Sequence, residues 1–314
     1  IFFYIFIFFY LLIVSITSLN VGISHDEHHH HEVWLINKKI YSNYFFGGNY
    51  EIIFKDFGMN FYGIGFQIFS LPIENFLKFI FSSLGIFQDI NYLIIKHPSI
   101  VILFTMSGIY FKKIIKLITN DELFSNISSI TYLMYPYLVG HSLFNNLDIP
   151  FMSIWLICTF YIMKISKSFI FKQIINFKDL IILSFLTAYL FSIRISGILI
   201  LFEYLIFIIF VLNLSKTSIL NFVKIFYKKI LISLFIFLFF FYFFHPNYWN
   251  DPLKVYDSFR YMSQHIQTVC TITLGECMKA QNLPSTYIPL WLFFKLPILV
   301  ILGIFLFPLI EKKL

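Results

Sequence analysis

Charged residues are scarce in this sequence: Asp, Glu, Lys and Arg together make up 12% of its 314 residues. Soluble globular domains carry about 25% charged and about 45–50% apolar residues. Apolar residues reach 59% here, so the composition excludes a soluble globular protein and a disordered chain. The class that remains is an all-α polytopic membrane protein, which excludes nucleic acid as a partner and includes membrane lipids.

Arginine and cysteine are rarer still. Arg194 and Arg260 stand beside 21 lysines, whereas Phe (44) and Tyr (20) are abundant. We attribute this bias to an AT-rich genome, so an aromatic stripe is weak evidence for a site. Cys158, Cys270 and Cys277 show no zinc-type spacing with histidine. The sequence also has no Gly-rich phosphate loop, internal repeat or coiled-coil heptad.

Eight segments are apolar enough to cross a bilayer, which takes about 20 mostly apolar residues. They are residues 1–19, 97–111, 123–140, 149–165, 179–194, 196–214, 230–245 and 288–310. Residues 1–19 lack a small-residue cleavage site, so we expect a retained helix rather than a signal peptide. Ile1 already stands inside an apolar run, which is what a fragment of a longer protein would show.

Thirteen lysines lie in the short loops between these segments or after the last one. They are Lys112, Lys113, Lys116, Lys164, Lys167, Lys172, Lys178, Lys216, Lys224, Lys228, Lys229, Lys312 and Lys313. A cytoplasmic N-terminus puts all of them inside, as the positive-inside rule requires. We therefore expect residues 1–314 to form a single transmembrane domain of eight to nine spans, with outer loops at about 20–96 and 246–286.

Residues 61–82 are the ambiguous stretch. They are apolar, but Gln67, Pro72, Glu74 and Lys78 interrupt them, and a span there would put the 112–116 lysines outside. We expect an interfacial or re-entrant segment.

The first outer loop opens with a run of acids and histidines, Ser24 to Glu32. The adjacent carboxylates of Asp26 and Glu27 at a membrane surface suit general-base chemistry or metal binding. His28 and His30, together with Asp26, are the candidate metal ligands. A solvated polar stretch explains the same histidines equally well.

Four further polar residues stand at outer ends of predicted spans. His141 and Asp148 belong to the turn before 149–165, where Asp148 fits an N-cap, with Pro150 in the first turn, or a residue of the outer cavity. Arg194 and Lys295 are cations at a membrane boundary. Each is either a phosphate ligand or a side chain that reaches the interface.

The second outer loop holds Cys270 and Cys277, with six residues between them. On an oxidising side of the membrane these two residues form either a disulfide or two free thiols, and the sequence favours neither. Gly275 would help the chain to turn back.

Five segments, in this order along the chain, resemble the dolichyl-phosphate-mannose protein mannosyltransferase-like family, whose members have the GT-C fold. They are Asp26-Glu27; Phe61-Tyr62-Gly63 with Phe66; Gly140-His141-Ser142 through Asn146 with Asp148-Ile149-Pro150-Phe151; Ser192–Gly197; and Leu283-Pro284 with Tyr287-Ile288-Pro289-Leu290-Trp291. Two features depart from the family pattern: the histidines at 28–31, and Leu147, where relatives often carry Lys.

The resemblance implies an inverting glycosyltransferase that moves a sugar from a polyprenyl-phosphate donor to a hydroxyl of a protein, lipid or glycan acceptor. It implies that Asp26 is the general base and that Glu27 positions the acceptor or the base. His141, Asp148, Arg194 and Lys295 would serve the donor phosphate and the substrates. Relatives differ in metal use, so a divalent metal stays open. The expected location is a bacterial inner membrane with an outward-facing site.

Two other classes fit the same composition. A transporter or flippase for a lipid-linked sugar would also have an outer cavity and interrupted helices, but no inverted repeat is present and the acids lie in loops. A non-catalytic membrane subunit with the same fold is the third interpretation.

Overall fold

The computed structural model describes residues 2–47, 62–85, 92–171, 175–264, 270–273, 275–279 and 282–311. It divides into two units, Ile1–Ser258 and Phe259–Leu314. The predicted residues Phe61, Lys172, Lys312 and Lys313 lie outside the described ranges. The expectation of an all-α protein is confirmed, since the described residues are helical apart from connections and one short hairpin. The single-domain organisation stays a prediction.

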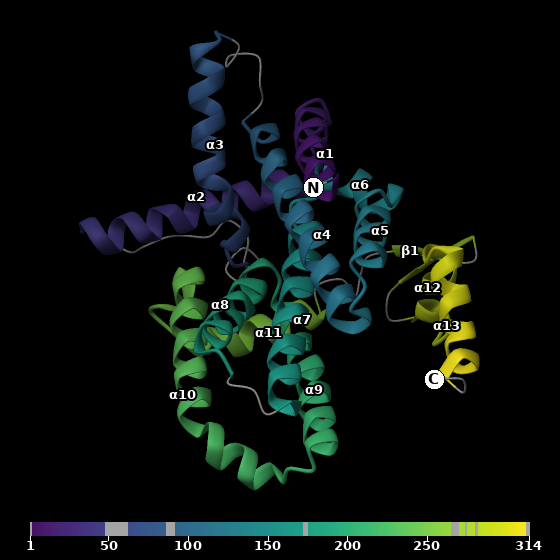
Figure 1. Cartoon of the computed structure of the whole chain (residues 1–314). Helices are drawn as coiled ribbons and strands as arrows, with labels where there is room; N and C mark the ends of the chain where they lie inside the picture. Colours follow the sequence, from purple (N-terminus) through teal and green to yellow (C-terminus); the bar gives the residue numbers. More distant parts are fainter. Residues whose placement is uncertain are drawn as a thin grey trace. The chain divides into compact units, whose positions relative to one another are not determined.

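The elements of the first unit are shown in Figure 1. They are α1 (Phe2–Ser18), α2 (His25–Phe46), α3 (Gly65–Ser83), η3 (Ile94–Lys96), α4 (His97–Thr119), α5 (Glu122–Leu133), α6 (Pro136–Ser142), α7 (Asp148–Ile170), α8 (Phe177–Ile193), η4 (Ile195–Leu199), α9 (Ile200–Ser215), α10 (Ile219–Phe244) and η5 (Pro246–Tyr248). Helix α11 (Lys254–Gln264) contains the boundary between the units.

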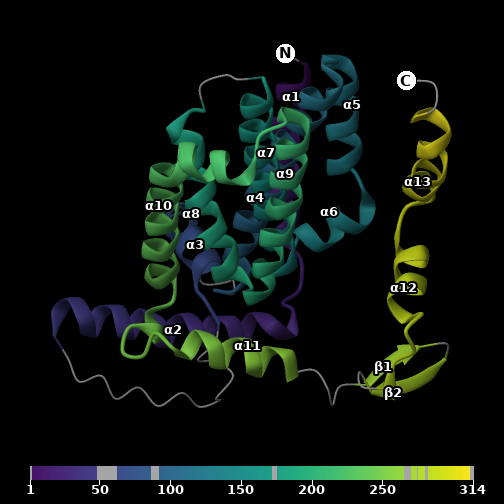
Figure 2. The same cartoon turned by 90° about the horizontal axis from the view of Figure 1, so that it is seen from below.

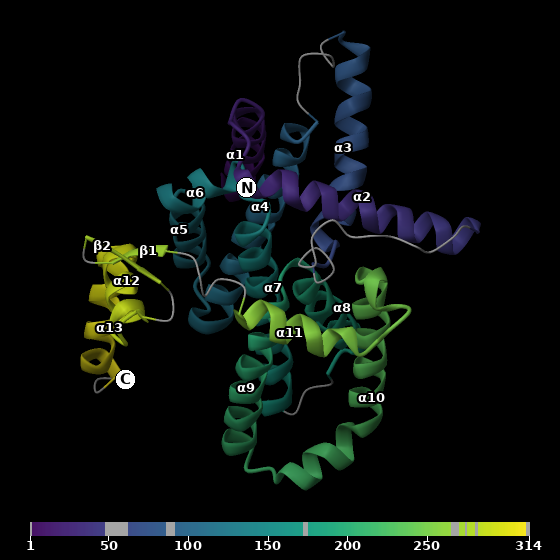
Figure 3. The same ribbon diagram turned by 180° about the vertical axis from the view of Figure 1, so that it is seen from behind.

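Helices α4, α7, α8, α9 and α10 pack as a bundle, in which α7 contacts α4, α8 and α9, and α8 contacts α10 (Figure 2). α4 and α7 begin at the same end of the bundle, and α8 and α10 end there. α2 is too polar to join the bundle, and it lies across this end (Figures 1 and 3).

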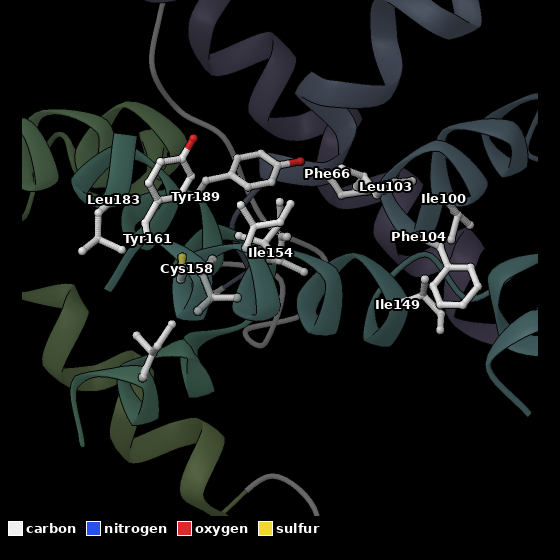
Figure 4. Packing of buried hydrophobic residues seen from close by; sticks show 14 of the residues in the cluster. Phe66, Ile100, Leu103, Phe104, Ile149, Ile154, Cys158, Tyr161, Leu183 and Tyr189 are labelled. Carbon is white, nitrogen blue, oxygen red and sulfur yellow. The ribbon is translucent and has the colours of Figure 1, made fainter. Parts of the chain in front are cut away.

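The core of the first unit lies between α4, α7 and α8, where Phe104, Ile154, Cys158 and Leu190 are almost wholly buried (Figure 4). Small residues allow close contact between helices, as they do in membrane bundles. On α4, a Cβ on Gly108 would lie 2.6 Å from the side chain of Leu133, and Gly108 O accepts a 2.7 Å hydrogen bond from Ser129 Oγ of α5. A larger residue at 108 would therefore push α5 away from α4.

Three helical segments in the described part of the chain are long and apolar enough to cross a membrane: Asp148–Ile170, Ile195–Ser215 and Ile219–Phe244. The first two contain the predicted spans 149–165 and 196–214, and the third contains the span 230–245 except for its last residue. α1 is apolar but has only 17 residues. The predicted span 97–111 is helical, but α4 continues to Thr119 and carries three lysines on its last turns. The count of eight to nine spans stays a prediction.

Two predicted spans are not continuous helices. The segment 123–140 is divided into α5 and α6 at Tyr135, and the segment 288–310 is divided at Leu296. Both residues precede a proline, which disfavours the helical conformation of the residue before it. Tyr135 has ψ 115° and Leu296 has ψ 140°, both extended. The prediction of a single helix was wrong at both places.

The predicted outer loop 20–96 is helical over much of its described part. α2 has 22 residues and begins three residues before His28, and α3 has 19 residues with Pro72 inside. α3 covers most of the stretch 61–82, whose interfacial or re-entrant character stays a prediction.

The second unit contains β1 (Cys270–Thr273), β2 (Glu276–Lys279), α12 (Tyr287–Lys295) and α13 (Ile298–Glu311). The strands pair antiparallel, with Cys270 opposite Lys279 and Thr273 opposite Glu276. A disulfide joins Cys270 to Cys277, whose Cα atoms are 5.5 Å apart, so of the two alternatives the disulfide is confirmed. Gly275 turns the chain with φ 85°, a left-handed value that a side chain would disfavour.

Candidate functional site

The first turn of α2 fixes the two predicted catalytic carboxylates in opposite environments. Ser24 caps the helix, and Glu27 Oε1 accepts a 2.7 Å hydrogen bond from the backbone N–H of Ser24, which is a capping box. Glu27 is buried, whereas Asp26, one position earlier, is exposed. The local sequence thus turns one carboxylate into the protein and leaves the other accessible.

Glu27 forms a buried pair with His97, the first residue of α4. Glu27 Oε2 lies 3.0 Å from His97 Nε2, and His97 Nδ1 lies 2.9 Å from the carbonyl oxygen of Ser18. Both partners of the imidazole are acceptors, and a neutral imidazole has one N–H only. An additional proton, carried by His97 or Glu27, therefore satisfies both contacts. The pair joins the end of α1, the start of α2 and the start of α4.

A buried lysine lies beside this pair. Lys96 of η3 is only 5% exposed, and its Nζ lies 3.2 Å from His31 Nδ1. Burial lowers the pKa of Lys96, and the carboxylate of Glu74 on α3 opposes that change. Partial burial and the nearby Lys96 lower the pKa of His31 to about 4, so neutral His31 accepts the hydrogen bond from Lys96. Glu74 is itself buried and accepts a 2.5 Å hydrogen bond from Ser70 Oγ.

His30, also on α2, interacts electrostatically with Arg194, which comes much later in the sequence. Its ring is buried against Tyr62, with ring centroids 5.3 Å apart. Burial lowers the pKa of His30 to about 4, His29, Arg194 and Lys96 act in the same direction, and Asp26 opposes them. Because Asp26 and Arg194 both act on the charge of His30, the start of α2 and the end of α8 lie in one region.

Arg194 follows the last residue of α8 and pairs with the start of α7. Its Nη2 lies 2.8 Å from Asp148 Oδ1. Asn145 Nδ2 donates to Asp148 Oδ2 at 3.0 Å, and Asn145 Oδ1 accepts from the backbone N–H of Leu147 and of Asp148. The prediction of Asp148 as the N-cap was wrong, because Asp148 is the first residue of α7 and Asn145 holds the preceding turn. His141 is half-buried, with Nδ1 3.4 Å from Asn145 Nδ2.

We call the residues that meet at this end of the bundle the polar cluster. They are Asp26, Glu27, His30, Lys96, His97, Asp148 and Arg194. Chemically, the cluster offers an exposed carboxylate that can accept a proton and a guanidinium that can bind an anion.

His28 and Lys295, two of the predicted site residues, are not part of the polar cluster. His28 is exposed on α2, and His30 is buried on the same helix. The described residues hold no group of three His, Cys, Asp or Glu side chains that could bind a metal ion. Lys295 is exposed in the last turn of α12, in the second unit.

Sequence reasoning missed Lys96 and His97. Their signal is the run Lys96-His97-Pro98 directly before an apolar segment, since Pro at the first turn marks the start of a helix and charged groups there are costly to bury.

Gly63 and Gly65 hold the segment before α3 against the end of α8. A Cβ on Gly63 would lie 2.4 Å from Ser192 O and 2.7 Å from His245 Nε2, and one on Gly65 would lie 1.9 Å from Ser192 Oγ. All three distances are far below van der Waals contact. The absence of side chains at 63 and 65 therefore lets the first predicted outer loop contact the end of α8, directly before Arg194.

No family model matches this chain, and neither the curated proteins nor the solved structures contain a match to it.

Proposed function

We propose that this protein is a membrane glycosyltransferase that moves a sugar from a polyprenyl-phosphate donor to an acceptor hydroxyl, with inversion at the anomeric carbon. The observation that supports it best is the polar cluster. An exposed carboxylate and a guanidinium lie at one end of a bundle that includes three membrane-length helices. A lipid-linked donor needs its phosphate and sugar held at such an end, because its hydrocarbon chain stays in the bilayer.

Asp26 is the proposed base. A hydroxyl acceptor is a poor nucleophile, and a nearby carboxylate that takes its proton accelerates attack by about 10²–10⁴-fold. The acceptor oxygen forms a bond to the anomeric carbon, and the bond between that carbon and the phosphate oxygen breaks. The electron pair of that bond leaves with the polyprenyl phosphate, and Asp26 keeps the proton. Both Glu27 carboxylate oxygens already have hydrogen-bond partners, so Glu27 suits the positioning of Asp26.

Arg194 is the proposed ligand of the donor phosphate. The leaving group gains negative charge as it departs, and a fixed cation stabilises that charge. Asp148 orients the guanidinium through its 2.8 Å contact. Asn145 donates a hydrogen bond to Asp148, and His141 contacts Asn145. Lys295 remains the second candidate cation. The site would face the non-cytoplasmic side of a bacterial inner membrane.

The direct test uses the purified full chain in lipid nanodiscs with polyprenyl-phosphate donors that carry a radiolabelled hexose or pentose. We expect release of polyprenyl phosphate and loss of label from the lipid fraction. Asp26→Asn should stop the release and keep donor binding, whereas Glu122→Gln, far from the polar cluster, should leave both the release and donor binding unchanged. Protein that binds the donors without cleaving them, or moves them across a vesicle membrane intact, would favour the subunit or transporter interpretation.

A further inference from the structure

A second feature of the first unit lies away from the polar cluster. A cavity of about 440 Å³ is lined by residues of α7, α8, α9 and α10 and is partly open to the outside. Cavities that bind small ligands are typically ~300–1,000 Å³. Its lining includes Ile165, Leu183, Phe226 and Phe237. Three of these four helices belong to the membrane-length segments, so the cavity lies where hydrocarbon is the surrounding solvent.

Three of the hydroxyl groups in the lining, those of Ser184, Thr187 and Tyr204, have partners within the protein. Thr187 Oγ1 donates to Leu183 O at 2.7 Å, and the hydroxyls of Thr187 and Tyr204 lie 2.8 Å apart. Ser184 Oγ donates to Leu180 O at 2.9 Å. Because these groups are already satisfied, the walls have little to offer a polar ligand. A flexible hydrocarbon chain fits this surface.

Lys229 contributes a charge to the lining. It is half-buried and is the last charged residue before the uncharged run from residue 230 to Phe244, and its Nζ lies 5.4 Å from the centre of the Phe226 ring. It therefore stands at the level where hydrocarbon gives way to lipid headgroups. Lys224 and Lys228 precede it on α10, and the carboxylate of Asp179, next in sequence to Leu180 of the lining, is already paired with Lys164 at 2.8 Å. The charge that α10 brings to this part of the lining is positive and suits an anion.

We propose that this cavity binds one acyl chain of an anionic diacyl phospholipid, whose phosphate contacts Lys229. Basic pockets between transmembrane helices bind anionic headgroups in this way. The site lies at the opposite end of α7 and α10 from the polar cluster. It does not depend on the proposed transferase activity, and it would keep α9 and α10 together across a surface that protein side chains leave partly open.

The test is lipid binding to the purified full chain, measured by native mass spectrometry with phosphatidylglycerol and with phosphatidylcholine of the same acyl chains. We expect tighter binding of phosphatidylglycerol. Lys229→Gln should weaken that binding by about fivefold, since this is roughly the effect of one basic residue at an anionic membrane surface. Lys229→Arg should retain it, and Lys224→Gln, on the same helix but outside the lining, should have a smaller effect.

A second variant tests the cavity itself. Ser233 is in the lining, and Ser233→Phe would fill the space for the acyl chain and lower the binding of both lipids. Size-exclusion chromatography checks that each variant is monodisperse. Equal affinity of the parent for the two lipids, equal binding by Lys229→Gln and Lys229→Arg, or unchanged binding by folded Ser233→Phe would overturn the proposal.

Discussion

The two ends of the bundle in the first unit use the same kinds of charged residue in different ways. At the polar cluster, ion pairs and hydrogen bonds join residues far apart in sequence: Glu27 with His97, Lys96 with His31, and Arg194 with Asp148. At the opposite end, which we call the lysine end, the pairs are local. Lys112 and Lys116 contact Glu122, and Lys164 contacts Asp179.

Burial differs as well. Glu27 and His97 are at most 2% exposed, whereas Glu122 and Lys116 are about half exposed. A buried charge is costly unless it is paired, while an exposed pair contributes little to stability. The contrast in burial is sharpest between the Glu27–His97 pair and the Lys116–Glu122 pair. Lys112 and Asp179 at the lysine end are also mostly buried, and Arg194 and Asp148 in the polar cluster are partly exposed. Five experiments test this contrast, from the largest expected effect to the smallest.

The largest expected effect is all or none and concerns orientation. Ser42 on α2 and Lys178 at the start of α8 are both exposed. In a variant without Cys158, Cys270 and Cys277, we expect Ser42→Cys to react with an impermeant thiol reagent in intact cells and Lys178→Cys to react only after lysis. The reverse pattern would contradict the cytoplasmic assignment of the lysine end.

Asp26→Asn keeps the shape of the side chain and removes its basicity. We expect turnover to fall by ~10²–10⁴-fold with donor affinity retained, measured as release of polyprenyl phosphate. Glu122→Gln is the matched control, since it makes the same type of change in an exposed pair at the lysine end. Near-normal turnover by Asp26→Asn would exclude it as the base and make Asp148 the next candidate.

His97→Ala leaves the charge of Glu27 buried without its partner. Loss of one member of a buried pair costs about 3–5 kcal/mol, so the thermal unfolding midpoint in detergent should fall sharply. Glu122→Gln should leave the midpoint nearly unchanged, because that side chain is about half exposed. If His97→Ala and Glu122→Gln unfold at similar temperatures, the two ends do not differ as proposed.

His30 should make the polar cluster sensitive to acid. The pKa of His30 is lowered from 6.5 to about 4, so the folded protein keeps it neutral where the unfolded chain is protonated. Stability should be fully present above pH 6.5 and be lost as the pH falls to about 4, by about 3 kcal/mol from this residue. His30→Gln should flatten that part of the curve of unfolding free energy against pH. An unchanged slope would exclude His30 as its source.

The smallest expected effect is at Arg194. Arg194→Lys keeps the charge and loses the planar fork of donors. We expect donor affinity to fall roughly tenfold, since a hydrogen bond to a charged group contributes ~1.5–3 kcal/mol. Stability should change little, because the pair with Asp148 is partly exposed on both sides. Unchanged donor binding in Arg194→Ala and Lys295→Ala together would move the phosphate site elsewhere.

The sequence predicted the helices that are uninterrupted apolar runs. The segments 149–165 and 196–214 lie inside α7 and inside η4 with α9, and the segment 230–245 ends one residue beyond α10, because hydrophobic length alone specifies them. α2 was missed because its residues are mixed in polarity and show little preference for one face. The helix breaks before Pro136 and Pro297 were predictable from the sequence, because a proline disfavours the helical conformation of the residue before it.

The candidate site was only partly predictable. Asp26, Asp148 and Arg194 attract notice because charges are rare near apolar segments. The contact between Glu27 and His97 could not be predicted, because 70 residues separate them and neither segment contains a signal that identifies the other as its partner. Burial was equally hidden, because Asp26 and Glu27 are neighbours of the same charge and only the capping box turns Glu27 inward.

The two glycines beside Ser192 have a consequence for how this sequence can vary. In a library that randomises each position and selects for folded protein, positions 63 and 65 should return glycine alone, because even a methyl group would overlap Ser192. Gly22 and Gly140 have no atom within 4 Å of a Cβ and should accept many residues. Gly63 and Gly65 should therefore tolerate far fewer substitutions than Gly22 and Gly140, although their only role is to allow the close contact beside the residues proposed for the chemistry.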